Sequence, residues 1–370
     1  MLDQWIGANR CLYNIALEQR SYRRFDGSYA TRLSQDKELS RLKKEFPWFG
    51  DCPSQTLQQT LKNLDTAFSR FFKKQADFPA FKKKSRPFGI KFPAPSSIKL
   101  HDHPHKRKGI VDIPKMKGLR FWKSRQLEGT LKSATVSRAA YGEYYISFLC
   151  EIEVDEPINK MPAVGIDRGI AHTIALSSGE FFDLPVDKIK YHEEKIAFLQ
   201  RQLTKKTKFS NNWKKLKNKI SRRHSKTACI RRDFLWKSAR TIAKSHGYIV
   251  LEDLKTKNMS KSASGTLESP GKMVAQKSGL NKAILRQGWH MFSVMLNQKA
   301  EEFGGYVDKV NPRNTSRECA SCGYTHVDNR QSQDRFECQK CSHKENADVN
   351  AAKVILARGL RASAFEPLSA

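Results

Sequence analysis

Apolar residues recur at different spacings along the chain, and the changes in spacing divide it into regions. Over residues 1–77 they fall three or four positions apart, the spacing of one helix face. A first helix is predicted from Trp5, Ala8, Leu12 and Ala16. A second helix is predicted to begin with Ser54 as its N-cap and to bury Leu57, Leu61, Leu64, Phe68 and Phe72. The N-terminal region is therefore expected to be helical.

Residues 78–161 show shorter apolar runs, which indicate strands. Strands are predicted at 110–114, 119–122, 134–138 and 144–154, with a tight turn at 141–143. Basic and aromatic positions among them favour a small β-barrel of the kind that grips oligonucleotides. His101, His103 and His105 lie beside Pro104 and a run of three basic residues, so we expect a solvated turn there rather than a metal site.

A third pattern begins at residue 162 and predicts an α/β domain. An apolar strand at 164–170 has Asp167 at its centre, where a carboxylate is costly unless it is paired or bound to metal. Strands at 173–176 and 181–182 continue an antiparallel meander, and a buried strand at 248–251 ends in Glu252. Residues 255–279 lack periodicity and predict a mobile loop, followed by a helix at 281–303 and a strand at 306–310. The pattern indicates an RNase H-like sheet, whose first strand carries a catalytic aspartate.

Residues 187–245 are predicted to form a long helical hairpin with an unusual charge. The segment contains 19 Lys or Arg residues and only four acidic ones. This excess is larger than solubility requires, so the hairpin is interpreted as a wall of a nucleic-acid channel. The residues predicted to contact nucleic acid are Lys214, Lys215, Arg222 and Arg223 here, and Lys82, Lys83 and Lys84 nearer the N-terminus.

The whole sequence of 370 residues is also strongly basic, with a formal net charge of +31. Phosphate contacts and counterion release dominate nucleic-acid affinity, so this surplus predicts a polyanionic partner. No apolar run approaches the roughly 18 residues of a membrane span, and neither a membrane nor a small-molecule substrate is expected. Four scattered cysteines suit a reducing compartment, so a cytoplasmic protein is predicted.

Two CxxC pairs predict a zinc ribbon at residues 313–344. Fifteen residues separate Cys319 and Cys322 from Cys338 and Cys341, a spacing at which four thiolates close a tetrahedral shell around Zn²⁺. No position is left for water, so one structural Zn²⁺ is expected. Two disulfides are the alternative, which the two-residue spacing disfavours.

Asp348 follows the ribbon and opens a segment with helical spacing. An acid there can cap a helix, which is the alternative to a chemical role. Together with Asp167 and Glu252, however, it completes an ordered set of three carboxylates. Hard oxygen ligands select Mg²⁺ or Mn²⁺, which activate water and stabilise a leaving oxygen, so these three acids are predicted to be both catalytic and metal-binding.

The motifs GIDRGI, LEDL, CASCG with CQKC, and ADVNAAKVIL together resemble the TnpB (OrfB) proteins of insertion sequences. Weaker similarity in CLYNIAL, RFFKK and FPAFKKK extends the resemblance over nearly the whole chain. Members usually open with a β-strand before the first helix, whereas Met1 here lies almost at that helix. The resemblance implies an RNA-guided DNA endonuclease related to type V CRISPR effectors, associated with the nucleoid of a bacterial or archaeal cell. Its partners would be a guide RNA from the transposon end and double-stranded target DNA cut beside a short flanking motif.

The resemblance also implies a domain layout. A helical recognition lobe (1–77) and a wedge barrel (78–161) would precede a RuvC nuclease domain (162–312) with an inserted zinc ribbon (313–344). The last RuvC helix (345–358) and a flexible tail (359–370) would follow. Two other functions remain open: a guide-independent RNase H-fold transposase, which would use the same three acids, and a guided repressor that binds DNA without cutting it.

Overall fold

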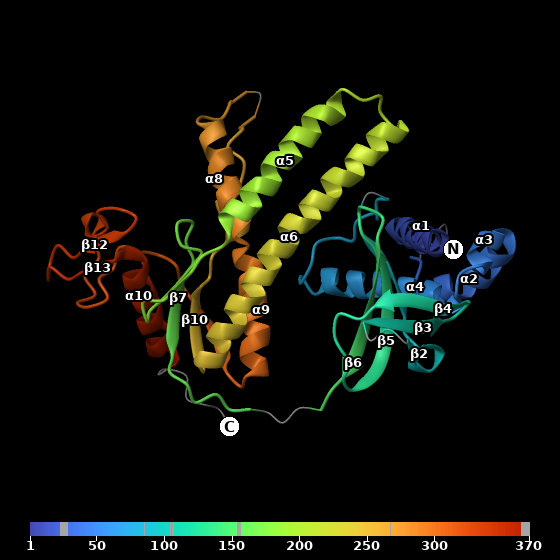
Figure 1. Cartoon of the computed structure of the whole chain (residues 1–370), viewed down its shortest axis with the longest axis horizontal. Helices are drawn as coiled ribbons and strands as arrows, with labels where there is room; N and C mark the ends of the chain where they lie inside the picture. Colours follow the sequence, from blue (N-terminus) through green and yellow to red (C-terminus); the bar gives the residue numbers. More distant parts are fainter. Residues whose placement is uncertain are drawn as a thin grey trace. The chain divides into compact units, whose positions relative to one another are not determined.

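The computed structural model describes residues 1–22, 29–84, 86–103, 105, 107–153, 157–266 and 268–363. The chain forms two compact units, residues 1–154 and 155–370 (Figure 1). The predicted tail, residues 359–370, lies partly outside the described residues. Val154, the predicted end of a strand, also lies outside them. Among the described helices, none combines the length and apolar character needed to cross a lipid bilayer.

The first unit begins with four helices, two of which the apolar spacing predicts. These helices are α1 (Leu2–Ser21), α2 (Arg32–Glu45), α3 (Pro47–Gly50) and α4 (Ser54–Phe72). The prediction of Ser54 as an N-cap is wrong, because Pro53 occupies the cap position and the Ser54 hydroxyl accepts a hydrogen bond from Lys43 instead. α2 was not predicted. It starts with a capping box between Thr31 and Ser34.

Two antiparallel three-stranded sheets make up the rest of this unit. One has the order β1 (Phe88–Phe92), β5 (Thr130–Arg138), β6 (Tyr144–Glu151), and the other β2 (Lys99–Asp102), β3 (Lys108–Ile113), β4 (Met116–Trp122). A short 3-10 helix, η1 (Pro95–Ser97), precedes β2. The predicted turn is present, with Gly142 in the left-handed region at φ 92°. β1 and β2 were not predicted, and the closed barrel stays a prediction.

The solvated turn predicted around the three histidines is wrong for His101. This residue lies in β2, and its Nε2 is 2.9 Å from the Asp112 carboxylate on β3. Pro104 and Lys106 lie outside the described residues. One apolar core runs through the first unit, joining Trp5 of α1 and Leu61 of α4 to Phe92 and Val111 of the two sheets.

The second unit is built on a five-stranded mixed sheet. Its order is β11 (Tyr306–Val310), β10 (Tyr248–Glu252), β7 (Val164–Asp167), β8 (Ile174–Leu176) and β9 (Phe181–Phe182). β11, β10 and β7 are parallel, whereas β8 pairs antiparallel with β7, and β9 pairs antiparallel with β8. This is the α/β arrangement that the sequence predicts, with the first strand central.

Helices cover both faces of this sheet, so its central strands are apolar on both sides. Ile249 and Leu251 of β10 pack in one core with α6 (Asn211–Ser245) and α9 (Trp289–Glu302). Tyr248 and Val250 of the same strand point to the other face, where α10 (Ala347–Ser363) contributes Ile355. Figure 1 shows β7 and β10 between α10 on one side and α6 and α9 on the other.

α10 lies unusually close to the sheet, and two glycines permit this approach. A Cβ on Gly165 of β7 would lie 2.1 Å from the Ala352 carbonyl oxygen and 2.7 Å from the Leu356 nitrogen, both backbone atoms of α10. A Cβ on Gly359 of α10 would lie 2.4 Å from a methyl carbon of Val250. The position of α10, and with it that of Asp348, therefore depends on residues without side chains at these two contacts.

The predicted hairpin consists of α5 (Val186–Thr204) and α6, which pack along each other. Two other predictions in this unit are wrong. The expected strand at 164–170 ends at Asp167, which is also the last residue that pairs with β8. The next residue, Arg168, is buried and donates from its guanidinium to backbone carbonyls of other segments. The expected helix at 281–303 is two helices, α8 (Val274–Gln287) and α9, separated by Gly288 at φ 73°. The predicted loop therefore contains the start of α8 and a short helix, α7 (Thr256–Met259).

The ribbon region is compact and has little regular structure. It contains η2 (Val327–Asn329) and a two-stranded antiparallel sheet of β12 (Arg335–Glu337) and β13 (Lys344–Asn346), and β13 continues directly into α10. The buried Asn329 links the two halves of the ribbon. Its side-chain nitrogen donates to the Arg317 and Tyr324 carbonyls, and its side-chain oxygen accepts from the Gln339 backbone nitrogen. Asn350 of α10 binds the backbone at Glu318 and Ala320 in the same way.

Candidate functional site

Two of the three predicted acids end neighbouring parallel strands. Asp167 is the last residue of β7 and Glu252 the last of β10. The residues before them, Ile166 and Leu251, are paired in the register of the two strands. The carboxyl ends of parallel strands meet at one edge of a sheet, which is where α/β folds place their ligand-binding groups. The two carboxylates therefore share an edge.

Asp348 reaches this edge from α10. It lies in the first turn of the helix, is 5% exposed, and its Oδ2 is 3.8 Å from the position that a Cβ on Gly169 would occupy. Gly169 follows Asp167 by two residues. The structure therefore brings the three acids to one end of the sheet from segments that are far apart in the sequence.

The carboxyl of Asp167 shows the electrostatic cost of this arrangement. Its pKa is raised to about 7, first by burial and then by the charges of Glu252 and Asp348, while Arg330 and the Arg168 backbone N–H oppose the shift. Burial also raises the pKa of Glu252, against a hydrogen bond from Thr315 and the charge of Arg168. A partly buried group of acids that repel one another favours binding of a cation.

Glu252 is held by two neighbours. The Thr315 hydroxyl donates to its Oε1, and the Arg168 guanidinium donates to its backbone carbonyl. Arg168 is itself 6% exposed and also donates to the Trp289 carbonyl at 3.3 Å, which ties the ends of β7, β10 and α9 together. Glu252 is therefore fixed at the sheet edge by its backbone as well as its side chain.

Asp348 is held by an arginine of the ribbon. Arg330 Nη2 donates to Asp348 Oδ1 at 2.9 Å and to the Gln333 carbonyl at 3.0 Å. The alternative role of Asp348 as a helix cap is filled by another residue, since Asn346 Oδ1 accepts from the backbone N–H groups of Asp348 and Val349. The Asp348 carboxylate is therefore available for interactions outside its own helix.

The three carboxylates nevertheless do not form a closed ligand set in this conformation. Among the described residues, the four ribbon cysteines make the one group of three or more potential metal ligands whose atoms all lie within 4.8 Å of one another. The donor type at the sheet edge suits a hard cation, since three acids offer oxygen atoms in a partly buried site. Thr315 and Arg330 hold two of these acids, so a cation would compete with both contacts.

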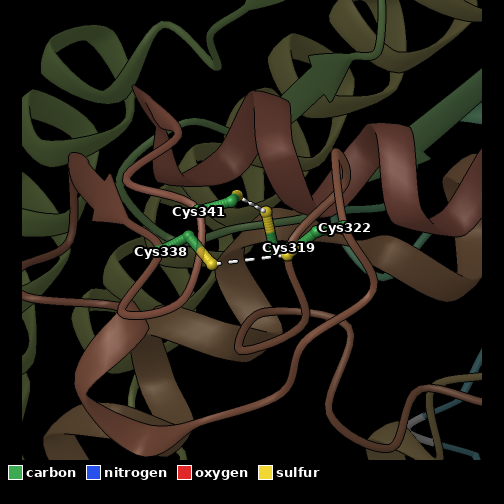
Figure 2. Close-up of side chains that lie close together, drawn as sticks. All are labelled: Cys319, Cys322, Cys338 and Cys341. Carbon is green, nitrogen blue, oxygen red and sulfur yellow. Dashed lines mark hydrogen bonds between the residues drawn. The ribbon is translucent and has the colours of Figure 1, made fainter.

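The cysteines converge as the spacing predicts (Figure 2). Cys319 Sγ lies 3.7 Å from Cys341 Sγ, and Cys322 Sγ lies 3.6 Å from Cys338 Sγ. All four are free thiols, and these separations are far beyond a disulfide bond. Four sulfur atoms at such distances fit a tetrahedral metal centre in donor type and number.

Comparisons with known proteins show the family to which this chain belongs. Residues 147–263 match the OrfB_IS605 family, described as "Probable transposase", and residues 289–355 match the "Cas12f1-like, TNB domain" family. The chain is 43% identical to the "Putative RNA-guided DNA endonuclease InsQ" of Escherichia coli K12, over 97% of this chain and 88% of that protein. The chain belongs to the TnpB (OrfB) family.

A second relative supports this membership, and a solved structure shows a similar fold. The "Putative RNA-guided DNA endonuclease" of Streptomyces pristinaespiralis is 30% identical over 98% of this chain and 86% of that protein. The protein in a Cas12f1–sgRNA–target DNA complex has the same fold, with a TM-score of 0.55 at 17% identity, covering 95% of this chain and 81% of that one. The resemblance predicted from the motifs is thus confirmed.

The basic residues predicted to contact nucleic acid lie on the surface of this TnpB-family chain. Lys214 and Lys215 are exposed in the first turns of α6. Arg223 Nη1 lies 3.2 Å from His192 Nδ1 on α5, so it bridges the two helices of the hairpin. In the first unit, Lys83 and Lys84 are exposed, and Lys82 Nζ lies 4.8 Å above the Tyr13 ring. Their contact with nucleic acid stays a prediction.

Three residues at the TnpB site were not predicted from the sequence: Arg168, Thr315 and Arg330. Arg168 directly follows a predicted acid, and its position after a strand-end carboxylate was a usable signal. Thr315 and Arg330 reach Glu252 and Asp348 across 63 and 18 residues. No spacing rule connects residues so far apart, so only the folded chain reveals these contacts.

Proposed function

We propose that this protein is an RNA-guided DNA endonuclease of a transposable element. Two family relatives carry that activity in their names, and the Cas12f1 fold occurs in a complex with guide RNA and target DNA. The observation that carries the proposal is that Asp167, Glu252 and Asp348 lie at one end of the sheet, where burial and then the charges of the other two acids raise the pKa of Asp167. The reaction would be phosphodiester hydrolysis of target DNA beside a short flanking motif.

The three acids are proposed as the ligands of Mg²⁺ or Mn²⁺. A divalent cation held there would activate water and stabilise the leaving oxygen of the phosphodiester. Binding requires the acids to be ionised, and Asp167, with its raised pKa, is the one whose proton must be lost near neutral pH.

Three neighbouring residues would position these acids. Arg168 fixes the end of β10 by binding the Glu252 carbonyl, and Thr315 sets the rotation of the Glu252 carboxylate. Arg330 pairs with Asp348, and its guanidinium would become available to a phosphate oxygen if Asp348 bound a cation instead. Because Arg330 lies in the ribbon, the ribbon would contribute directly to the arrangement of the site.

The metal at the four cysteines is proposed to be one structural Zn²⁺. Sulfur ligands select soft metals, and a complete set of four thiolates leaves no place for a reacting water. The ion would hold together a segment with few strands and a small apolar cluster around Phe336. Its function would be to keep Arg330 and the start of α10 in place.

The nucleic-acid partners would be a guide RNA from the transposon end and double-stranded target DNA. We propose residues 1–77 as the recognition lobe, 78–161 as the wedge, 162–312 as the RuvC domain and 313–344 as its ribbon, with residues 345–358 as its last helix. The basic hairpin would hold phosphates in this scheme, and the protein would act at the nucleoid. The formal charge of +31 supports a partner of this kind.

The decisive experiment is to sequence the RNA that co-purifies with the protein and to reprogram its guide segment. We expect one structured RNA that overlaps or adjoins the 3′ end of the gene, and Mg²⁺-dependent cutting of whichever DNA the new guide matches. Asp167→Ala, Glu252→Ala and Asp348→Ala should bind this DNA without cutting it. Cleavage or strand joining without RNA would identify a transposase instead, and guided binding by an intact triad without cleavage would identify a repressor.

A further inference from the structure

The tip of the α5–α6 hairpin has features that the binding of phosphates along the hairpin does not require. Six residues, 205–210, connect Thr204 at the end of α5 to Asn211 at the start of α6. Ser210 caps α6 by accepting a hydrogen bond from the Trp213 nitrogen at 3.2 Å, so the first turn of α6 is fixed. The tip therefore presents its side chains from a defined backbone.

Two aromatic rings lie together at this tip. The centroids of Phe209 and Trp213 are 5.5 Å apart, with a 59° angle between the rings. Phe209 is 65% exposed. Within the described part of the chain, the buried clusters of the second unit contain neither ring, so packing in a core does not explain them.

The backbone of Phe209 adds to this observation. Its φ is 69°, in the left-handed region, where a bulky residue is strained and glycine is favoured. The chain thus has an exposed aromatic ring at a position where glycine would fit better. Strained residues of this kind concentrate at sites that bind ligands.

Positive charge surrounds both rings. Seven lysines and no acidic residue occur over residues 205–219, and the nearest acids in the sequence are Glu194 and Asp233. Lys208 Nζ lies 5.3 Å from the Phe209 centroid, and Lys217 Nζ lies 4.9 Å from the Trp213 centroid. In the described ranges, no ion pair with a carboxylate engages any of these seven lysines. A hollow of about 490 Å³ beside them is lined by Gln202, Lys205, Lys206, Asn212 and Lys215, among others.

We propose that this tip binds an unpaired nucleotide, with the base stacked on Phe209 and Trp213 and the flanking phosphates held by the lysines around the hollow. Aromatic rings beside a basic groove are the chemistry by which proteins hold single-stranded nucleic acid. A duplex offers its phosphates but not its base faces, so the rings favour a base that is not stacked in a helix. RNA and DNA share this chemistry. The inference rests on the proposed function only in taking nucleic acid as the partner.

The test must resolve the site, because other basic surfaces of the chain also bind nucleic acid. The full-length protein is mixed with short single-stranded RNA or DNA oligonucleotides of mixed sequence and cross-linked with ultraviolet light. The peptides that carry a cross-linked nucleotide are then mapped by mass spectrometry. We expect bases attached to Phe209 or Trp213 with single strands, and none at these residues with duplexes of the same sequence. Comparison of the RNA and DNA samples shows which source the tip prefers.

Variants at the two rings separate a loss of binding from a loss of stability. Phe209→Gly removes one ring at a position whose backbone suits glycine, so thermal stability should be unchanged or raised. We expect this variant and Trp213→Ala to lose the tip attachment and roughly 10- to 100-fold in single-strand affinity at that site. Trp213→Tyr keeps a ring and should retain attachment. Lys205→Gln with Lys215→Gln keeps both rings and should lower the salt dependence by about one slope unit per lost contact.

Several outcomes would overturn the inference. They are absence of attachment at the tip with both RNA and DNA, equal attachment with duplexes, or full retention of binding in Phe209→Gly combined with Trp213→Ala. Mapping on Asp167→Ala keeps the two proposals distinct, since binding at the tip requires no cleavage. Guided cleavage without tip attachment would contradict this inference alone, and tip attachment without any guided cleavage would contradict only the proposed function.

Discussion

At the scale of single residues, Asp348 and Asn346 divide two roles that the sequence could not separate. Asn346 caps α10, whereas Asp348 pairs with Arg330 and lies near the other two acids. The cap and the proposed chemistry therefore belong to different side chains, two positions apart. Paired substitutions can test each role by itself.

Asp348→Ala should leave target binding intact and abolish cleavage. Loss of a metal ligand that stabilises developing charge costs several kcal/mol of barrier, and about 4 kcal/mol is roughly a thousandfold in rate. Asn346→Ala is the matched control. Asn346→Ala should lower the free energy of unfolding by about 1 kcal/mol and should retain most of the wild-type cleavage rate. Thermal unfolding, target binding and Mg²⁺-dependent cleavage are measured on both, and near wild-type cleavage by Asp348→Ala would refute the triad.

Asp167 should make stability depend on pH when Mg²⁺ is absent. Its folded-state pKa of about 7 lies above the ordinary value of 3.8, so this group stabilises the fold fully below about pH 4. The contribution is lost as the pH rises through about 7, because the folded chain must then ionise the buried carboxyl. The difference between these two pKa values corresponds to about 4 kcal/mol in the free energy of unfolding.

The variant Asp167→Asn removes this titration. In Mg²⁺-free buffer it should therefore unfold at a higher temperature than the wild type at pH 8, and the advantage should shrink as the pH falls toward 5. Added Mg²⁺ should stabilise the wild type and not the variant. An advantage that is the same at both pH values would show that Asp167 does not carry the raised pKa.

At the scale of elements, the α5–α6 hairpin is proposed to bind phosphates along its length. Reversing Lys214, Lys215, Arg222 and Arg223 to Glu should weaken binding to all sequences alike and lower the slope of log K against log salt by about one unit per contact. The charge-preserving pair Lys214→Arg and Lys215→Arg should keep the slope. Filter binding over a series of salt concentrations measures it, and an unchanged slope after reversal would mean that the hairpin does not contact phosphates.

The ribbon is predicted to contain one equivalent of zinc. Cys338→Ser with Cys341→Ser should abolish metal binding. It should also reduce cleavage, because Arg330 and Asn346, which hold Asp348 and cap α10, lie in the same region of the chain. Cys229→Ser changes an exposed thiol outside the ribbon and serves as the control that keeps the metal. Elemental analysis of each purified protein checks the prediction, which fails if the double variant retains zinc.

Sequence patterns predicted the elements that depend on local spacing. The strand-end position of Glu252 follows from a continuous apolar run, and the convergence of the cysteines follows from the CxxC motif. Both signals involve near neighbours. The break at Gly288 was visible as a glycine within a helical pattern, yet the apolar spacing on both sides continued across it. The contacts of Arg330 and Thr315 could not be predicted, because they arise only when the ribbon packs against the sheet edge.

At the scale of the whole molecule, the two compact units have separate cores. The core around Trp5 and Phe92 belongs to the first unit, and those around Ile249 and Ile355 belong to the second. The ribbon lies wholly in the second unit. Loss of its metal should therefore affect one unit more than the other.

Calorimetry should show two unfolding transitions, and a zinc chelator should lower the temperature of only one of them. Limited proteolysis of the chelated protein should cut first within the ribbon, residues 313–344. The zinc-loaded protein is the control. A single transition that moves as a whole on chelation would show that the two units unfold together.

The close approach of α10 to Gly165 has a further consequence for how the protein is made. β7, with Gly165 and Asp167, leaves the ribosome about 180 residues before α10 does, and this helix covers one face of the sheet. During synthesis that face has no cover, and Asp167 and Glu252 have no third acid beside them. The proposed nuclease would therefore be inert on the ribosome until its last helix emerges and packs against β7 at Gly165. A nascent chain could then engage RNA through the basic hairpin before it is able to cut DNA.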